Sequence, residues 1–272
     1  MKNYISILIA AATITVISCG DEHQYFPEKQ MADEASTKIK FIHAASDTVG
    51  LNLFLDGQKL TGNAPSIVST GAVNIGKVIF DTSFPITDYV SVSGAAGSFS
   101  AIVPETYTVT DTFAVKTLTE LDATITSAKS YTVALVGVTT AYEMVLYEDD
   151  LSTAPMDDKA YIRFAGFIDN LADQLTLQGT PPATPEDPAP VPVKLVEHIN
   201  FKDMSAFIAL PRVGKYTNMQ LINETTAAVV YTLPAASALN TFINNKVYTY
   251  YAKGRIGGAG GAAPGIGRSI NR

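Results

Sequence analysis

The chain has 272 residues, of which 47% are apolar and 17% are charged. This composition is too apolar for a disordered chain and supports a packed core. The formal net charge is −7, from 19 basic and 26 acidic side chains, which argues against a nucleic-acid partner because phosphate recognition needs clustered Lys and Arg. The single cysteine excludes an intramolecular disulfide, a multi-cysteine zinc site and an iron–sulfur cluster.

The first residues have the pattern of a secretory signal. A positive charge at Lys2 precedes an apolar run over residues 5–17, which is too short to span a bilayer as a helix. The only cysteine, Cys19, ends this run in a Val-Ile-Ser-Cys sequence that resembles the lipobox of bacterial lipoproteins. The resemblance implies that residues 1–18 are a cleaved signal peptide and that Cys19 carries lipid, which anchors stably with more than one acyl chain. The alternative is an ordinary signal peptide followed by a free cysteine.

Residues 19–37 are polar and acidic and show no periodicity, which predicts a lipidated flexible tether. Asp21 and Glu22 directly follow Cys19, and acidic residues at this place resemble the surface-export signal of lipoproteins in the Bacteroidetes group. We therefore expect a lipid-anchored outer-membrane protein that faces the cell exterior. The alternative is an acidic tether that faces the periplasm.

From residue 38 onward, apolar and polar residues alternate and turn signals recur about every 8–12 residues, which predicts an all-β protein. Ile39 and Phe41 share one face of the first expected strand, and Asp56-Gly57 closes a hairpin. The pattern restarts near residue 160, at an offset of about 120 residues. The sequence thus predicts two tandem β-sandwich domains, residues 38–150 and 160–272, joined by a linker over residues 151–159. One long sandwich is the alternative.

Two segments rich in turn-forming residues interrupt the strand pattern. Residues 180–192 hold six of the fourteen prolines, and because proline lacks an N–H and fixes φ, this insertion in the second domain is expected to be an extended surface excursion. Residues 81–87, with Pro85, are expected to be a connecting loop. The glycine-rich residues 254–267 are expected to return a last short strand to the sheet.

Three segments resemble the bacterial domain-of-unknown-function 4397 family. The segment IKFIHAASDTVGLNLFLDG (residues 39–57) resembles the family's opening, although its turn lacks the usual proline. YTVALVG (residues 131–137) followed by EDDLS (residues 148–152) resembles the middle, and residues 248–272 resemble the closing segment. The resemblance implies a secreted or surface lipoprotein with tandem immunoglobulin-like domains and no established catalytic residues. We therefore expect that the protein is not an enzyme.

The nearest arrangement to a nucleophilic triad is His43 with Ser46 and Asp47. A triad needs a nucleophile beside a base that a third group orients. Turn residues of this kind more commonly bond the local backbone, so we assign no catalytic residue here.

Acidic residues suggest two further kinds of site. The pairs Asp169 with Asp173 and Asp149 with Asp150 are candidates for glycoside hydrolysis, although adjacency in the sequence does not establish a cleft. Calcium prefers hard oxygen ligands, and the linker region offers five: Glu148, Asp149, Asp150, Asp157 and Asp158. A solvated acidic linker is the commoner arrangement, so no cofactor is expected beyond the covalent lipid on Cys19.

Tyr248, Tyr250 and Tyr251 are weak candidates for a ligand-binding ring on the surface, because glycan sites on β-sandwiches use flat aromatic side chains. The chain has no tryptophan, and core packing is the more common arrangement for at least one face of this strand, so we favour it there.

Together these features predict a non-enzymatic lipoprotein that binds a partner protein or an extracellular glycan, as an accessory subunit of an outer-membrane complex. The alternative is a lipid-anchored pilus or fibre subunit that assembles by strand exchange, with the C-terminal segment at residues 266–272 as the donor strand.

Overall fold

The computed structural model describes residues 36–272 except positions 49, 62–65, 68–72, 75–76, 93–95, 105–114 and 139–140. The signal peptide, Cys19 and the tether up to residue 35 therefore lie outside the described residues. The regular elements of the described chain are strands and three short 3-10 helices, which confirms the predicted all-β class. None of its helices is long and apolar enough to cross a membrane.

The first half of the chain, here the N-terminal unit, builds two main sheets and one small strand pair. The inner sheet has the order β11-β10-β1-β6, with β7 also paired to β1, and contains β1 (Thr37–His43), β6 (Thr82–Phe84), β7 (Val90–Val92), β10 (Ser130–Val136) and β11 (Glu143–Glu148). The outer sheet has the order β3-β2-β8-β9 and contains β2 (Asn52–Leu55), β3 (Gln58–Lys59), β8 (Ala96–Pro104) and β9 (Val115–Thr124). The small pair is β4 (Ser66–Ile67) with β5 (Val73–Asn74).

The C-terminal unit repeats this plan. Its inner sheet has the order β15-β12-β20-β21 and contains β12 (Ala160–Gly166), β15 (Ile208–Ala209), β20 (Lys246–Lys253) and β21 (Gly265–Ile270). Its outer sheet has the order β14-β13-β17-β18 and contains β13 (Leu175–Thr180), β14 (Val193–Ile199), β17 (Thr217–Asn223) and β18 (Val229–Thr232). The remaining elements are β16 (Gly214–Lys215), β19 (Thr241–Phe242) and the 3-10 helices η1 (Leu151–Thr153), η2 (Ala238–Asn240) and η3 (Gly260–Ala262).

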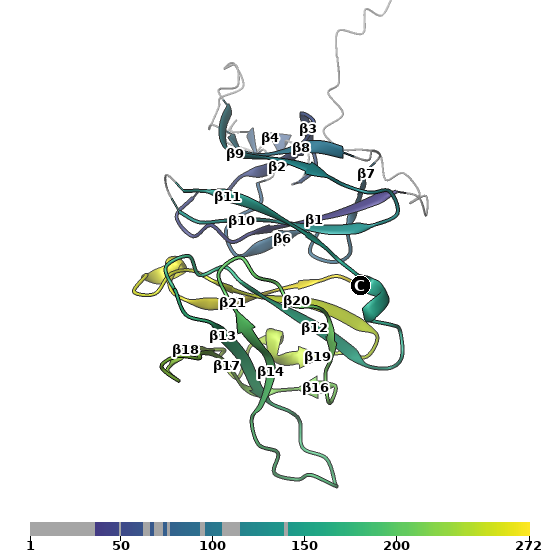
Figure 1. Ribbon diagram of the computed structural model, residues 1–272, viewed down its shortest axis with the longest axis vertical. Coiled ribbons are helices and arrows are strands. Elements are labelled where there is room, and N and C mark those ends of the chain that lie inside the picture. Colours follow the sequence, from purple (N-terminus) through teal and green to yellow (C-terminus); the bar gives the residue numbers. More distant parts are fainter. Residues whose placement is uncertain are drawn as a thin grey trace, which may run out of the picture.

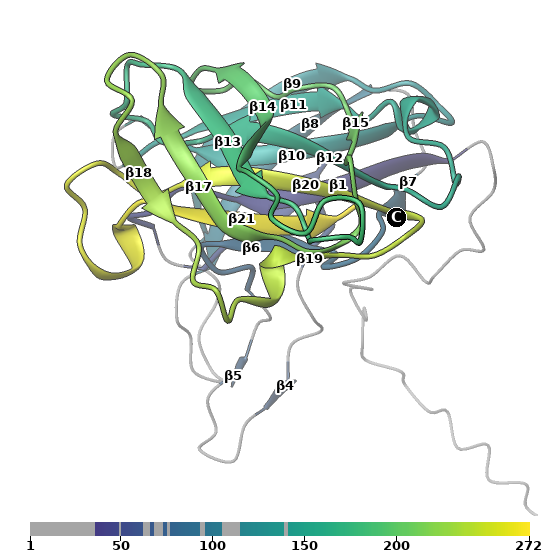
Figure 2. The ribbon, with the colours of Figure 1, turned by 90° about the horizontal axis from the view of Figure 1, so that it is seen from below.

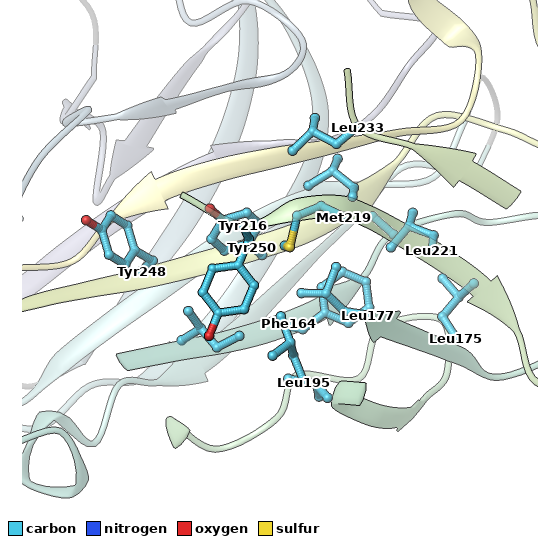
Figure 3. Packing of buried hydrophobic residues seen from close by; sticks show 14 of the residues in the cluster. Phe164, Leu175, Leu177, Leu195, Tyr216, Met219, Leu221, Leu233, Tyr248 and Tyr250 are labelled. Atoms are coloured by element: carbon cyan, nitrogen blue, oxygen red, sulfur yellow. The ribbon is translucent and has the colours of Figure 1, made fainter. Parts of the chain in front are cut away.

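The four main sheets form successive layers along the long axis of the molecule, with the two inner sheets in the middle (Figure 1). The view along this axis superposes β12 and β20 on β1 and β10, so the two views together place the inner sheets face to face (Figure 2). Three hydrophobic clusters fill the spaces between the layers. Buried side chains of the C-terminal unit's core, among them Phe164, Met219 and Tyr250, converge between its two sheets (Figure 3).

Alternation along β1 explains how one strand serves two cores. Ile39 and Phe41 enter the core of the N-terminal unit, whereas Ile42 enters the cluster between the two inner sheets. Successive side chains of a strand point to opposite faces, and both faces of this strand are covered. β1 is therefore buried along almost its whole length.

The predicted hairpin at Asp56-Gly57 is confirmed. Both residues have positive φ, 49° and 78°, and the strands pair directly across them, with Leu55 opposite Gln58. A two-residue turn with positive φ at both positions matches the twist of the flanking strands, and Asp-Gly suits it because glycine adopts this conformation without steric cost.

The segments rich in turn-forming residues follow their predictions in part. Residues 181–192 carry no strand and extend from the end of the molecule formed by the C-terminal unit (Figure 1). Arg212 fixes this excursion through Pro182 O at 2.8 Å and an ion pair with Asp187 at 2.8 Å. The expected loop at residues 81–87 instead contains β6, which pairs with the C-terminal half of β1.

Candidate functional site

His43 and Asp47 of the possible triad contact groups outside the triad. The His43 side chain is fully buried at the end of β1, with ring centroids 6.5 Å from Phe41 and 6.2 Å from Phe80. Asp47 accepts a hydrogen bond from the hydroxyl of Tyr142 at 3.1 Å. The geometry thus places the imidazole among aromatic rings and gives the carboxylate a different partner.

The paired acids are likewise engaged separately. Asp169 forms an ion pair with Arg255 at 3.2 Å. Asp173 accepts hydrogen bonds from Asn223 and Thr225 at 2.9 and 2.8 Å, which hold the pKa of this carboxyl below its usual range.

The five candidate calcium ligands do not converge. Each is paired with a different group: Glu148 with Lys129, Asp149 with Arg163, Asp150 with the N-terminus of η1, Asp157 with Tyr161 and Lys159, and Asp158 with Asn245. Within the described part of the chain, no group of three or more His, Cys, Asp or Glu side chains is arranged to hold a metal ion. The acidic linker instead stabilises the local turn and the junction between the units.

The three candidate tyrosines are part of the core, and the expectation of a surface ring is wrong for them. Tyr248, Tyr250 and Tyr251 are 2%, 0% and 0% exposed. Alternation does send Tyr248 and Tyr250 to one face and Tyr251 to the other, but the first face meets the outer sheet and the second meets the N-terminal unit. No aromatic face of this trio is left for a glycan.

A buried ion pair lies at the junction, defined here as the contact between the two inner sheets. Arg163 on β12 binds Asp149, directly after β11, at 2.7 Å, and their side chains are 3% and 0% exposed. The guanidinium also donates to Thr132 at 2.9 Å and to Thr249 at 2.8 Å. Its contacts therefore reach both inner sheets and tie the two units together.

A second cation lies in the junction without a carboxylate of its own. Lys40 on β1 is fully buried and donates to Pro85 O at 3.1 Å and to Ile270 O at 2.8 Å. Burial lowers the pKa of this ammonium to about 7, although Asp149 and Asp88 act in the opposite direction. Lys40 thus links β1 to β21 across the junction through backbone carbonyls.

Asp149 accepts a second set of bonds that complete this buried network. The hydroxyl of Tyr89 donates to it at 2.7 Å, and Asn271 donates to the same hydroxyl at 2.6 Å. Burial raises the pKa of Tyr89, so the phenol keeps its proton. Because buried polar groups are costly unless bonded, the bonds among Asp149 Oδ2, Tyr89 and Asn271 favour one docking geometry of the two units.

The junction builds a groove on one side of the molecule, here called the junction groove. It has a volume of about 550 Å³ and is lined by residues 77–79 and 81–87 of the N-terminal unit and by Arg268 of the C-terminal unit. Backbone bonds join its two sides, because Ile270 N donates to Ile86 O and Asp88 N donates to Ile270 O. The docked arrangement adds Arg268 to a wall that the N-terminal unit otherwise supplies.

The junction groove combines apolar side chains with the hydroxyls of Thr82, Ser83 and Thr87 and with two positive charges. Ile79 and Ile86 are 59% and 74% exposed. Asp81 is neutralised by an ion pair with Lys253, whereas Lys77 and Arg268 form no ion pair with any residue that the structure describes. The groove can therefore bind an apolar chain that carries negative charge.

Sequence reasoning did not find the junction groove. Ile79 and Ile86, at the two ends of the segment that contains β6, were the local signal, because aliphatic residues beside an expected loop can form an exposed apolar patch. Arg163 gave a second signal, since it is the only charged residue in β12.

The fold defines the class as an all-β protein of two linked two-sheet units with a groove at their junction. Residues 37–171 match the model of a family described as a domain of unknown function, DUF4397, which supports the family resemblance of the sequence. The match spans the N-terminal unit and β12, and it does not reach the closing segment at residues 248–272. No curated protein matches the chain.

Proposed function

We propose that the protein is a non-enzymatic, lipid-anchored lipoprotein of the outer membrane that faces the cell exterior. Its two units would be immunoglobulin-like sandwiches that hold a partner protein or an extracellular glycan, as an accessory subunit of a larger complex. The observation that carries this proposal is the junction groove, which combines apolar side chains with two positive charges between two docked units. Binding sites are frequently preformed clefts at domain interfaces.

The buried network supports a binding role because it fixes the groove before a ligand arrives. A rigid site loses little conformational entropy on binding, which favours affinity. The candidate catalytic groups His43, Asp169 and Asp173 are occupied by the core or by local partners. These contacts support the proposal that the protein holds its ligand without transforming it.

Lipid on Cys19 would place the groove close to, but free of, the membrane. Residues 20–36 span at most roughly 60 Å when fully extended, at about 3.3–3.6 Å per residue. A tether of this reach would allow the folded units to contact a neighbouring protein while the anchor stays in the bilayer.

The anchor is tested by replacing the proposed acylation site. Cys19→Ala should move the protein from the membrane fraction to the soluble fraction of the native host, as seen by immunoblotting after ultracentrifugation. Unchanged membrane partition would overturn the anchor.

Binding is tested by pull-down from solubilised outer membranes with identification of the co-purifying chains. The same chains should be lost with Ile86→Ser in the groove and retained with Val229→Ser, a control that is also exposed, at 51%, and lies on the outer sheet. Equal recovery with both variants would contradict a role for the groove.

The strand-exchange alternative has one structural feature in its favour, since β21 is the last strand and lies at the edge of its sheet. Release of β21 would break its antiparallel pairing with β20, which runs without interruption from Tyr248 opposite Ile270 to Lys253 opposite Gly265. It would also remove Asn271 from the buried network. Because β21 is held by these contacts, we favour the binding protein over the fibre subunit.

A further inference from the structure

We infer that the junction groove binds an extended, acidic peptide segment of a partner protein. In this complex, apolar side chains of the peptide cover Ile79 and Ile86, and one of its carboxylates pairs with Arg268. This inference rests on the proposed function and names the partner class of the same site.

The apolar side chains of the groove set the first requirement on the ligand. A groove of about 550 Å³ lies within the ordinary range for a binding site, roughly 300–1,000 Å³. Two isoleucines on its wall are more than half exposed, and burying such side chains is favourable in proportion to the apolar area removed from water. The ligand must therefore present apolar groups along an open, elongated surface.

Charge sets the second requirement. Arg268 is held in place by its donation to Thr241 O at 3.0 Å and by packing of its guanidinium 5.1 Å from the ring centroid of Tyr248. A guanidinium fixed in this way is suited to a carboxylate, which it binds through charge-assisted hydrogen bonds. Lys77 adds a second positive charge at the rim, although the chain as a whole carries −7.

The backbone of the wall favours a peptide over a glycan. β6 lies at an edge of its sheet and, among the described strands, pairs with β1 alone. Edge strands bind extended peptides by strand addition, in which side-chain pockets provide specificity. Glycan sites rely on flat aromatic platforms, whereas Tyr248, Tyr250 and Tyr251 are buried and Phe84 is the one aromatic residue among the described residues that line the groove.

The test selects ligands directly and does not require the partner to be identified first. The full chain, purified as the host produces it, is used to select from a phage-displayed library of random peptides of about ten residues, the upper length of a typical strand. We expect the enriched peptides to combine at least one Asp or Glu with alternating apolar residues. A synthetic copy of the most enriched peptide then serves as the probe in fluorescence anisotropy.

Three variants locate the probe. Arg268→Gln and Ile86→Ser should each weaken binding about tenfold or more, the scale of one charge-assisted or well-buried contact. Lys116→Gln, which removes an exposed positive charge from β9 on the outer sheet, should leave binding within about twofold, as expected for a distant screened charge.

Because Arg268 also bonds the backbone, its loss could disturb the fold, so Lys77→Glu at the exposed rim is measured in parallel. Lys77→Glu should weaken binding of the peptide probe at low salt without changing the midpoint of thermal unfolding. Enriched peptides without acidic residues, undiminished binding to Arg268→Gln and Lys77→Glu, or no enriched peptide would each overturn the inference. A polysaccharide that binds the wild type but not Ile86→Ser would overturn the inference of a peptide ligand and leave the proposed binding function standing. Membrane retention of Cys19→Ala would contradict only the lipid anchor.

Discussion

Lys40 and Arg163 occupy equivalent positions in the two units. Lys40 lies opposite Thr132 in the parallel pairing of β1 with β10, and Arg163 lies opposite Thr249 in the parallel pairing of β12 with β20. Both side chains turn into the junction and are almost fully buried. The junction is therefore formed by the same face of two repeated units.

The equivalence extends to the residue after the neighbouring edge strand. Thr132 donates to Asp149 at 2.7 Å, and Thr249 donates to Asn271 at 2.7 Å. One unit thus supplies an acid where the other supplies an amide, so these two equivalent positions provide a single carboxylate, Asp149, for Lys40 and Arg163. The extra cation, Lys40, is accommodated by backbone carbonyls instead.

We predict that Asp149→Asn strongly destabilises the protein. The substitution leaves Arg163 buried without its counter-ion, and breaking a buried pair by removing one partner costs about 3–5 kcal/mol. Chemical denaturation with urea measures the change in the free energy of unfolding. The neighbouring Glu148→Gln, whose ion pair with Lys129 is largely exposed, should unfold close to the wild type. Similar stabilities for the two variants would show that the buried pair is not important for the fold.

The stability of the wild type should depend on pH through Lys40. Its pKa is lowered to about 7 by burial, from an ordinary value of 10.5. Between these values the unfolded chain holds a proton that the folded chain has released, so the free energy of unfolding should rise with pH, by up to about 1.4 kcal/mol per pH unit.

The contribution of Lys40 is isolated by comparison with Lys40→Met, which fills a similar volume without charge. The difference between wild type and variant should grow in favour of the wild type from pH 7 towards pH 10, measured by urea denaturation at each pH. Parallel curves for the two proteins would contradict the assignment.

Gly267→Ala should destabilise the C-terminal unit. Gly267 lies opposite Tyr251 in the pairing of β20 with β21, and a Cβ at this position would come within 2.2 Å of the tyrosine ring. Overpacking of a buried site typically costs about 1–3 kcal/mol. A matched control is Gly261→Ala, because a Cβ there would meet no atom within 4 Å. Thermal unfolding should separate the two variants, and equal midpoints would be inconsistent with this close contact.

Deletion of residues 266–272 distinguishes the binding protein from the fibre subunit. The deletion removes nearly all of β21 together with Asn271, so we expect a monomeric wild type and a less stable, aggregation-prone variant, because β20 would become an exposed edge. Size-exclusion chromatography with light scattering gives the masses of both. A polymeric wild type that becomes a stable monomer on deletion would instead support strand exchange.

The all-β class, the Asp56-Gly57 hairpin and the proline-rich excursion followed from local sequence, because alternation and turn residues act over a few positions. Ile39 and Phe41 could be assigned to one face of a strand in the same way. The roles of the charged and aromatic residues could not be assigned from local sequence. Lys40 and Arg163 occupy positions in the alternation that ordinarily face solvent, and Tyr251 was a plausible surface residue for the same reason.

Sequence alone determined which side chains share a face of each strand, since the period of two is a property of the backbone. Only the tertiary structure decided what covers that face. Stacking of the two inner sheets removed Lys40, Arg163 and Tyr251 from water, gave Asp149 its partner, and brought Arg268 to the loop that carries Ile86. These contacts join residues that are far apart in the chain, and their free energy depends on burial, which no local pattern records.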